Sequence, residues 1–113
     1  MKRVCLLGMT MYGLQPLTVV AEVSKPNPQL PDQVVTWSTL AAKHMACAEQ
    51  AMDSKDMVSA ALHKGESLSA YQKGLSLSQQ HNMADKFKWT TVHYKAWFLD
   101  NHHLSPSDCL IDF

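Results

Sequence analysis

The sequence has no excess of positive charge. Its 113 residues contain ten lysines and arginines against ten aspartates and glutamates, which gives a formal net charge of zero. A phosphate backbone is held by clustered basic side chains, and this chain has no basic cluster beyond Lys86 and Lys88. We therefore expect no nucleic-acid partner.

Motifs that carry catalysis are also missing. The segment GESLS, residues 65–69, does not form the pattern of a nucleophile elbow, and no glycine-rich loop is written to cradle phosphate. No pair of carboxylates stands out from ordinary helix surface, and neither CxxC nor HExxH occurs as a local zinc motif. The sequence therefore predicts a protein that binds rather than an enzyme.

The N-terminus has the three parts of a signal peptide. Residues 1–3 (MKR) are positively charged, residues 4–14 are mostly apolar, and residues 19–21 (VVA) suit a signal peptidase. We predict that residues 1–21 are removed after Ala21 and that the protein is exported, to a periplasm or outside the cell. Two alternatives remain open, namely a buried strand and an uncleaved N-terminus that anchors the chain in a membrane.

The remaining chain is long enough for one helical domain. Residues 22–31 contain three prolines and are expected to form an extended arm. Apolar residues then recur with a helical period over 32–53, 55–80 and from 82 to about 102. Short connections between them predict an all-α fold, a small antiparallel three-helix bundle in up-down-up order over residues 32–113. The expected N-caps are Asp32, Asp53 or Ser54, and Asn82.

Each of the later two helices has an expected core face. In the second helix the main stripe is Met57, Ala61, Leu68, Tyr71 and Leu75, flanked by the small residues Ser67, Ala70 and Gly74. The third helix carries an aromatic stripe of Phe87, Tyr94, Trp97 and Phe98. Opposite it lies a second apolar strip, which three helices would not bury and which we expect to contact a partner: Trp89, Val92, Ala96 and Leu99.

Two cysteines remain once the signal peptide, with Cys5, is removed. An even number of cysteines in an oxidising compartment predicts a disulfide, here between Cys47 and Cys109. A reactive thiol is the alternative, but the sequence shows no electropositive setting for one. Such a bridge would order the C-terminal tail and lay Leu110, Ile111 and Phe113 against the bundle.

The six histidines are the other unusual feature. At 1.5 Å of rise per helical residue, His44, His63 and His102 fall at similar heights in the folded bundle, where they could share one layer. Such a layer could bind zinc, nickel or copper, with Met45, Met52 and Met57 as additional soft ligands. The alternative is that His44 is a hydrogen-bonded core residue and the other histidines lie at the surface or at helix ends.

One segment resembles a known family. The stretch AAKHMACAEQA, followed at His63 by HKGESL, is similar to the helical hairpin of the small histidine-rich metal-binding proteins of the bacterial periplasm. The resemblance covers about residues 40–70 and implies a helical bundle that binds divalent metals. It carries over to His44 and His63, whereas Ala51, Asp56 and Ala70 stand where that family has further histidines.

Taken together, these patterns predict a small exported helical protein that binds a protein partner, or itself, through its third helix or its proline-rich arm. Metal sequestration by the histidines is the first alternative, and a membrane-anchored helical protein with an uncleaved N-terminus is the second. No cofactor is expected unless the histidines bind zinc, nickel or copper.

Overall fold

The computed structural model describes residues 24–100 and 103–110 and is all-helical over this part of the chain. Within residues 24–100 and 103–110, three helices follow one another, α1 (Asp32–Asp53), α2 (Met57–Gln80) and α3 (Ala84–Leu99), and a short 3₁₀ turn, η2 (Pro106–Cys109), lies in the tail. No strand occurs among the described residues. The predicted all-α class is confirmed.

The helices begin at other residues than the caps expected from the sequence. Pro31 precedes α1, so Asp32 is already inside the first turn. The side chain of Asp56, rather than Asp53 or Ser54, caps α2 by accepting from the Ser59 backbone N–H at 3.1 Å. Lys55 has a φ of 62° and separates that cap from the end of α1.

The third helix is shorter than predicted at both ends. Asn82 does not cap it. This residue has a φ of 57° and lies in the turn after α2, and Met83 takes the cap position. Asparagine tolerates this left-handed conformation better than most residues. At the other end the backbone becomes extended at Asp100.

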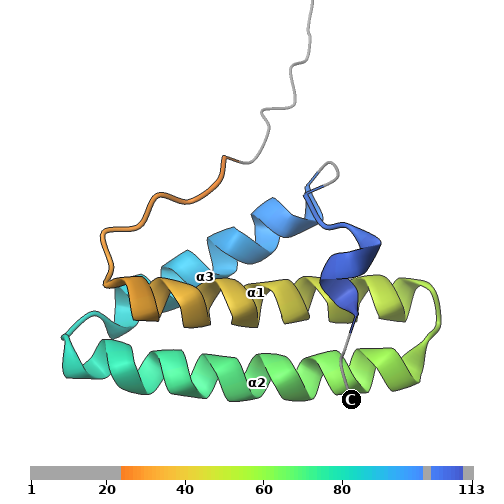
Figure 1. Cartoon of the computed structure of the whole chain (residues 1–113), viewed down its shortest axis with the longest axis horizontal. Coiled ribbons are helices and arrows are strands. Elements are labelled where there is room, and N and C mark those ends of the chain that lie inside the picture. Colours follow the sequence, from red (N-terminus) through yellow and green to blue (C-terminus); the bar gives the residue numbers. More distant parts are fainter. Residues whose placement is uncertain (1–23, 101–102, 111–113) are drawn as a thin grey trace, which may run out of the picture.

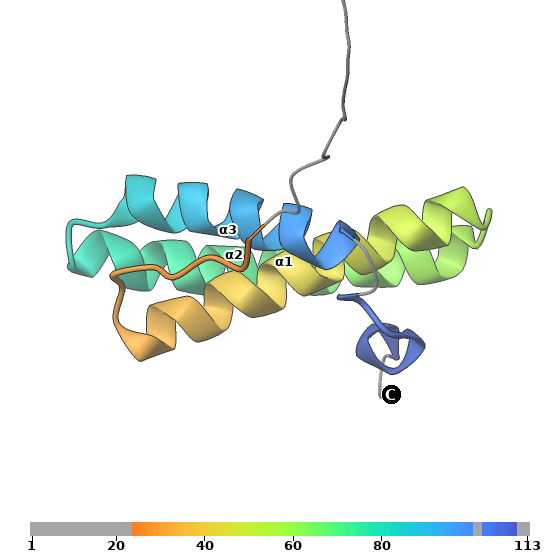
Figure 2. The same cartoon turned by 90° about the horizontal axis from the view of Figure 1, so that it is seen from above.

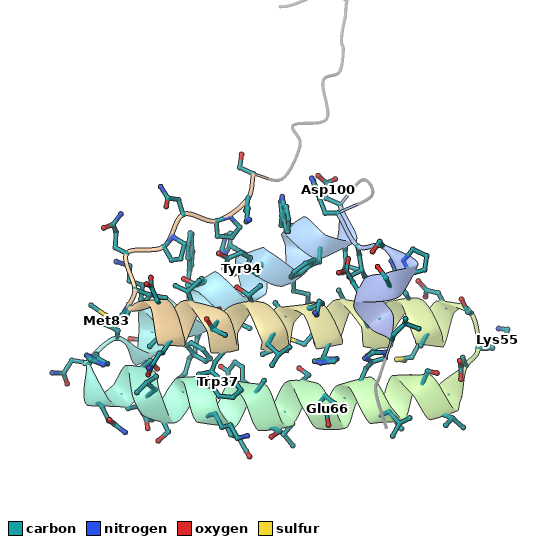
Figure 3. All side chains as sticks on the ribbon, viewed as in Figure 1. Trp37, Lys55, Glu66, Met83, Tyr94 and Asp100 are labelled. Carbon is teal, nitrogen blue, oxygen red and sulfur yellow. A yellow bond between two sulfur atoms is a disulfide. The ribbon has the colours of Figure 1, made fainter. Side chains whose placement is uncertain are left out.

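Helix α1 packs against both of the other helices. Figure 1 shows α2 beside α1 and running in the opposite direction, while α3 returns along another side of α1; the turned view in Figure 2 agrees. In Figure 3, Trp37 lies at the α1–α2 interface, and Lys55 and Met83 mark the two turns. Because α1 lies between its neighbours, it must present a separate inner face to each.

Small side chains form the interface between α1 and α2. The stripe predicted for α2 was wrong, since Met57 and Leu68 are exposed, and the flank of small residues turns inward instead. Such residues let two helix backbones approach closely, and the hydroxyl of Ser67 donates across this contact to the Ala41 carbonyl at 3.0 Å. The buried face of α2 consists of Ala60, His63, Ser67, Ala70, Gly74 and Ser78.

Larger side chains fill the interface between α1 and α3. Tyr94 and Phe98 of the predicted aromatic stripe are buried there with Ala42 and Ala46, while Trp97 is half-buried. Phe87 of the same stripe is buried against α2, beside Tyr71 and Gly74. The buried hydroxyls of Ser38 and Thr91 lie 2.8 Å apart. Thr91 also donates to the Phe87 carbonyl at 2.9 Å, so its single proton is used and Ser38 must be the donor between the two hydroxyls.

The arm and the tail both return to the bundle. Residues 24–31 contain no helix or strand, and Lys25 lies over the Trp97 ring at 5.2 Å from its centre. In the tail, Leu104 is buried, but Leu110 is 76 % exposed, so the prediction that it covers the bundle was wrong. Ile111, Phe113, His102 and the predicted signal peptide lie outside the described residues. None of the described helices is both long and apolar enough to cross a membrane.

Candidate functional site

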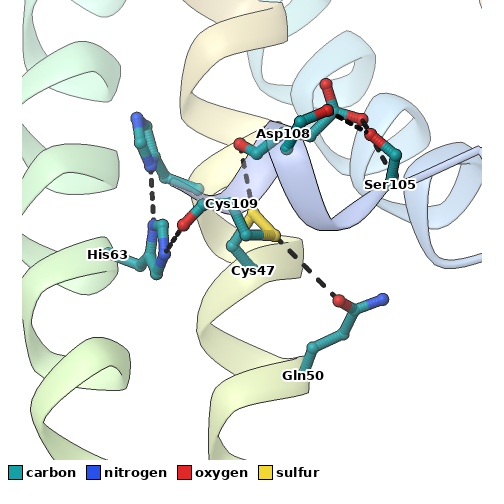
Figure 4. Close-up of a disulfide and its surroundings, with 8 residues drawn as sticks. Cys47, Gln50, His63, Ser105, Asp108 and Cys109 are labelled. Carbon is teal, nitrogen blue, oxygen red and sulfur yellow. Dashed lines mark hydrogen bonds between the residues drawn. A yellow bond between two sulfur atoms is a disulfide. The ribbon is translucent and has the colours of Figure 1, made fainter. Parts of the chain in front are cut away.

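A disulfide joins the tail to the bundle. Cys47 on α1 and Cys109 in η2 are bonded, with their Cα atoms 5.4 Å apart, inside the limit of about 7 Å for such a bridge. Figure 4 shows this corner. The turn that carries Cys109 is closed by Asp108, whose carboxylate accepts from the Ser105 backbone N–H at 2.9 Å. Hydrogen bonds from Ser105 lower the pKa of Asp108.

Two of the predicted histidines meet beside this disulfide. The Nδ1 atoms of His44 on α1 and His63 on α2 lie 2.9 Å apart, and the residues are only 9 % and 2 % exposed. The other ring nitrogen of His63, Nε2, lies 2.9 Å from the Cys109 carbonyl oxygen. Figure 4 marks this hydrogen bond with a dashed line. Both rings are therefore tied into one chain of hydrogen bonds that ends on the tail.

The direction of these hydrogen bonds follows from the carbonyl. A carbonyl oxygen only accepts, so the Nε2 atom of His63 carries a proton and donates it to Cys109. In a neutral ring the Nδ1 atom of His63 is then bare, and His44 donates to it. Burial, and next the neighbouring His63, lower the pKa of His44, which favours the neutral form of the His44 ring. The pair thus holds one proton between two Nδ1 atoms.

Two of the three histidines in the predicted metal layer lie in contact in the structure. His44 and His63 come together, whereas His102 lies outside the described residues. Among the described residues no group of three or more histidine, cysteine, aspartate or glutamate side chains is placed to hold a metal ion. Met57 is exposed, and Met45 and Met52 line a separate groove that neither histidine lines.

The predicted partner-binding strip of α3 lies on the surface. Trp89 is 57 % exposed, Val92 62 % and Leu99 40 %, and Ala96 is exposed as well. These residues follow each other at steps of three and four, which places them on one side of the helix. The opposite side, with Phe87, Thr90, Thr91, Tyr94 and Phe98, is buried. The α3 strip, as we call these four residues, is thus an apolar face without cover in the described part of the chain.

Neighbouring side chains hold the tryptophans of α3. His93 stacks on Trp89 at 3.8 Å between ring centres, and its Nδ1 atom lies 2.8 Å from the Trp89 carbonyl. His103 makes the same pair of contacts with Trp97, at 4.3 Å and 3.1 Å. One face of the Trp89 indole is therefore fixed by His93.

An apolar groove between α1 and α2 was not foreseen from the sequence. Its volume is about 390 Å³, and Met45, Met52, Leu68 and Tyr71 are among its lining residues. Charged side chains stand among its lining residues, namely Lys64 and the ion pair of Glu49 with Lys95. The sequence could have indicated this groove through the small residues Ala48 and Ser67, which line it between larger side chains.

No protein-family model, curated protein or solved structure matches this chain. The resemblance to histidine-rich periplasmic metal-binding proteins therefore stays a prediction.

Proposed function

We propose that this chain is a small exported binding protein, without catalytic activity, that contacts a protein partner through the α3 strip. The observation that carries the proposal is the exposure of Trp89, Val92, Ala96 and Leu99 on one side of a helix whose other side is fully used. Apolar faces of this kind on soluble domains mark interaction sites.

The composition of the strip supports a protein partner. Tryptophan contributes strongly to protein interfaces because it buries a large apolar area with few freely rotating bonds. The stacked ring of His93 holds Trp89 in place, which lowers the entropy cost of binding. The groove adjoins this helix, because Lys95 of α3 is among its lining residues. A partner on the strip can therefore extend into the groove.

The proline-rich arm is less available than α3. Pro26, Pro28 and Leu30 are half-buried, and Lys25 is engaged with Trp97. The arm thus uses part of its own surface against the bundle. We place the partner site on α3 for this reason.

Two measurements on the purified protein test this function. Sedimentation shows whether the partner is a second copy, and photo-crosslinking from a benzophenone side chain at position 92 captures any other partner in an extract of the producing cells. The control carries the same crosslinker at Lys86, an exposed position of α3 outside the strip. Replacement of Trp89 and Leu99 by Gln should abolish the captured band or the dimer. Equal capture from both positions, or capture that survives the replacement, contradicts the proposal.

Export is supported by the signal-peptide pattern of residues 1–21 and, weakly, by the disulfide. The mature chain should begin at Glu22. Intact mass under non-reducing conditions tests both cleavage and the bridge. Recovery of only the full-length chain would instead favour the membrane-anchored alternative.

Metal binding is a second candidate function, favoured by the two Nδ1 atoms that face each other at 2.9 Å. Two imidazoles on a tetrahedral zinc ion hold their nitrogens roughly 3.3 Å apart, given a Zn–N distance near 2.05 Å, so a small opening would admit a metal in place of the shared proton. Calorimetric titration of the disulfide-bonded protein with zinc, nickel and copper tests this. Absence of uptake, or equal uptake after His44→Ala and His63→Ala, contradicts it.

A further inference from the structure

The corner that joins the tail to the bundle contains two cysteine sulfurs and a histidine ring in direct contact with the tail. His63 donates from Nε2 to the carbonyl of Cys109, and the sulfur of Cys109 is bonded to that of Cys47. These three residues also line one cavity of about 270 Å³, next to the α1–α2 turn. Figure 4 shows their arrangement. We propose that reduction of the disulfide turns this corner into a zinc site, with the thiolates of Cys47 and Cys109 and the Nε2 atom of His63 as ligands.

The oxidised protein lacks this site for a chemical reason. Thiolates bind metal ions, whereas the sulfurs of a disulfide have no charge to offer. This agrees with the absence of a metal-holding group of three side chains among the described residues of the bridged form. The same cysteine pair therefore serves a disulfide under oxidising conditions and a metal under reducing ones, a division that follows the redox state of the compartment.

The conversion balances in atoms and electrons. A dithiol transfers two electrons and two protons to the bridge, so that Cys47 and Cys109 become thiols and the dithiol becomes a disulfide. Zinc then displaces one proton from each thiol and the Nε2 proton of His63 to solvent, and two Zn–S bonds and one Zn–N bond form. His63 releases its Nε2 proton and takes the proton held between the two Nδ1 atoms, while His44 gains one on its own Nε2. Both rings remain neutral and stay hydrogen-bonded to each other.

The geometry permits this rearrangement. Two thiolates on a tetrahedral zinc ion lie about 3.8 Å apart, given a Zn–S distance near 2.3 Å, so Cys109 has to withdraw from Cys47. The tail can shift in this way because Leu110 is exposed and η2 is closed by its own Ser105–Asp108 hydrogen bonds. Metal-bound histidines usually hold their second ring nitrogen in a hydrogen bond, and His44 already makes that bond with His63.

The fourth coordination position would face the cavity. Gln50, Asp56 and Ser59 share its lining with the three proposed ligands, so a bound water finds polar neighbours there. Thiolate and imidazole together are the ligand types that suit zinc best. The site thus has the form of three protein ligands and one open position.

Cobalt titration of the reduced and the oxidised protein tests the proposal. The full chain is reduced with dithiothreitol, which is then removed by anaerobic gel filtration, and Co²⁺ is added as a coloured substitute for zinc. We expect the reduced chain to bind a single Co²⁺ with the strong visible bands of tetrahedral coordination and a thiolate charge-transfer band, both of which zinc abolishes. The oxidised chain has no thiolate and should lack the charge-transfer band, and cobalt bound without that band would report the pair of Nδ1 atoms instead.

Variants identify the ligands. Cys109→Ser should remove the charge-transfer band or halve it, and His63→Gln should weaken Co²⁺ binding by more than about tenfold, since even outer-shell partners contribute that much. His93→Gln, at a histidine whose described contacts are with Trp89 and not with this site, is the matched control and should leave Co²⁺ binding unchanged. Absence of the bands in the reduced wild-type chain overturns the proposal, and this comparison needs no variant to fold. Partner binding by the α3 strip shares no residue with this site, so the two proposals fail separately.

Discussion

Replacement of Gly74 by alanine tests the close approach of the helices directly. A Cβ atom at this position would lie 2.4 Å from Cε1 of Phe87 and 2.8 Å from Cβ of Trp37. Phe87 is fully buried, and a Cβ atom moves only with its backbone, so neither neighbour can give way easily. Gly65 lies in the same helix, but a Cβ there meets nothing within 4 Å. The two glycines therefore form a matched pair.

The expected free-energy changes have opposite signs. In a helix interior alanine is favoured over glycine by about 1 kcal/mol, which both variants gain. Only Gly74→Ala also overpacks the core, which costs about 1–3 kcal/mol. Because the contacts are so short, we expect a cost at the upper end of this range. We expect Gly74→Ala to lose about 2 kcal/mol of unfolding free energy and Gly65→Ala to gain about 0.5–1 kcal/mol.

Urea denaturation followed by circular dichroism measures both changes with the disulfide intact. For a domain of this size a loss of about 2 kcal/mol corresponds to a fall in Tm of roughly 8–16 °C. A Gly74→Ala variant that is as stable as the wild type, or as stable as Gly65→Ala, would refute the close packing of α1, α2 and Phe87.

Three further predictions concern buried groups. The hydroxyl of Thr90 has no hydrogen-bond partner among the described residues, so Thr90→Val should keep or raise the free energy of unfolding. Thr91→Val removes two hydrogen bonds and should lower that free energy by about 1–3 kcal/mol. Similar urea midpoints for the two variants would contradict this prediction. Replacing Cys47 and Cys109 by alanine removes the disulfide between residues 62 apart and should lower the free energy of unfolding by about 4 kcal/mol, because the unfolded chain gains entropy. Urea denaturation measures this change. The pKa of His44 is lowered from 6.5 in the folded chain, so as pH falls His44 is protonated first in the unfolded chain. The stability that neutral His44 contributes is therefore complete above pH 6.5 and declines as pH falls toward the lowered pKa. A wild-type urea midpoint that does not fall in this range, or that falls equally in His44→Asn, would count against this prediction.

The site was only partly accessible from the sequence. The rise per helical residue was enough to bring His44 and His63 to the same height, because both helices are regular and the turn between them is short. It could not show that the Cys109 carbonyl orients His63, since that contact joins residues 46 apart through the disulfide-linked tail. The direction of the proton between the rings depends on this contact.

The sequence by itself determined the order and approximate extent of the helices, because local periodicity and turn residues act over a few positions. It also indicated the cysteine pair, by count alone. Which face of α2 turns inward was decided by the tertiary structure. Periodicity pointed to Met57 and Leu68, yet close packing against α1 favoured small residues, and Gly74 admits Phe87 where any side chain would collide. The groove arose from the same choice, since it forms where Leu68 and Tyr71 stand beside the buried Ala48 and Ser67. Such features depend on which surfaces fit each other in three dimensions, and no local pattern records that fit.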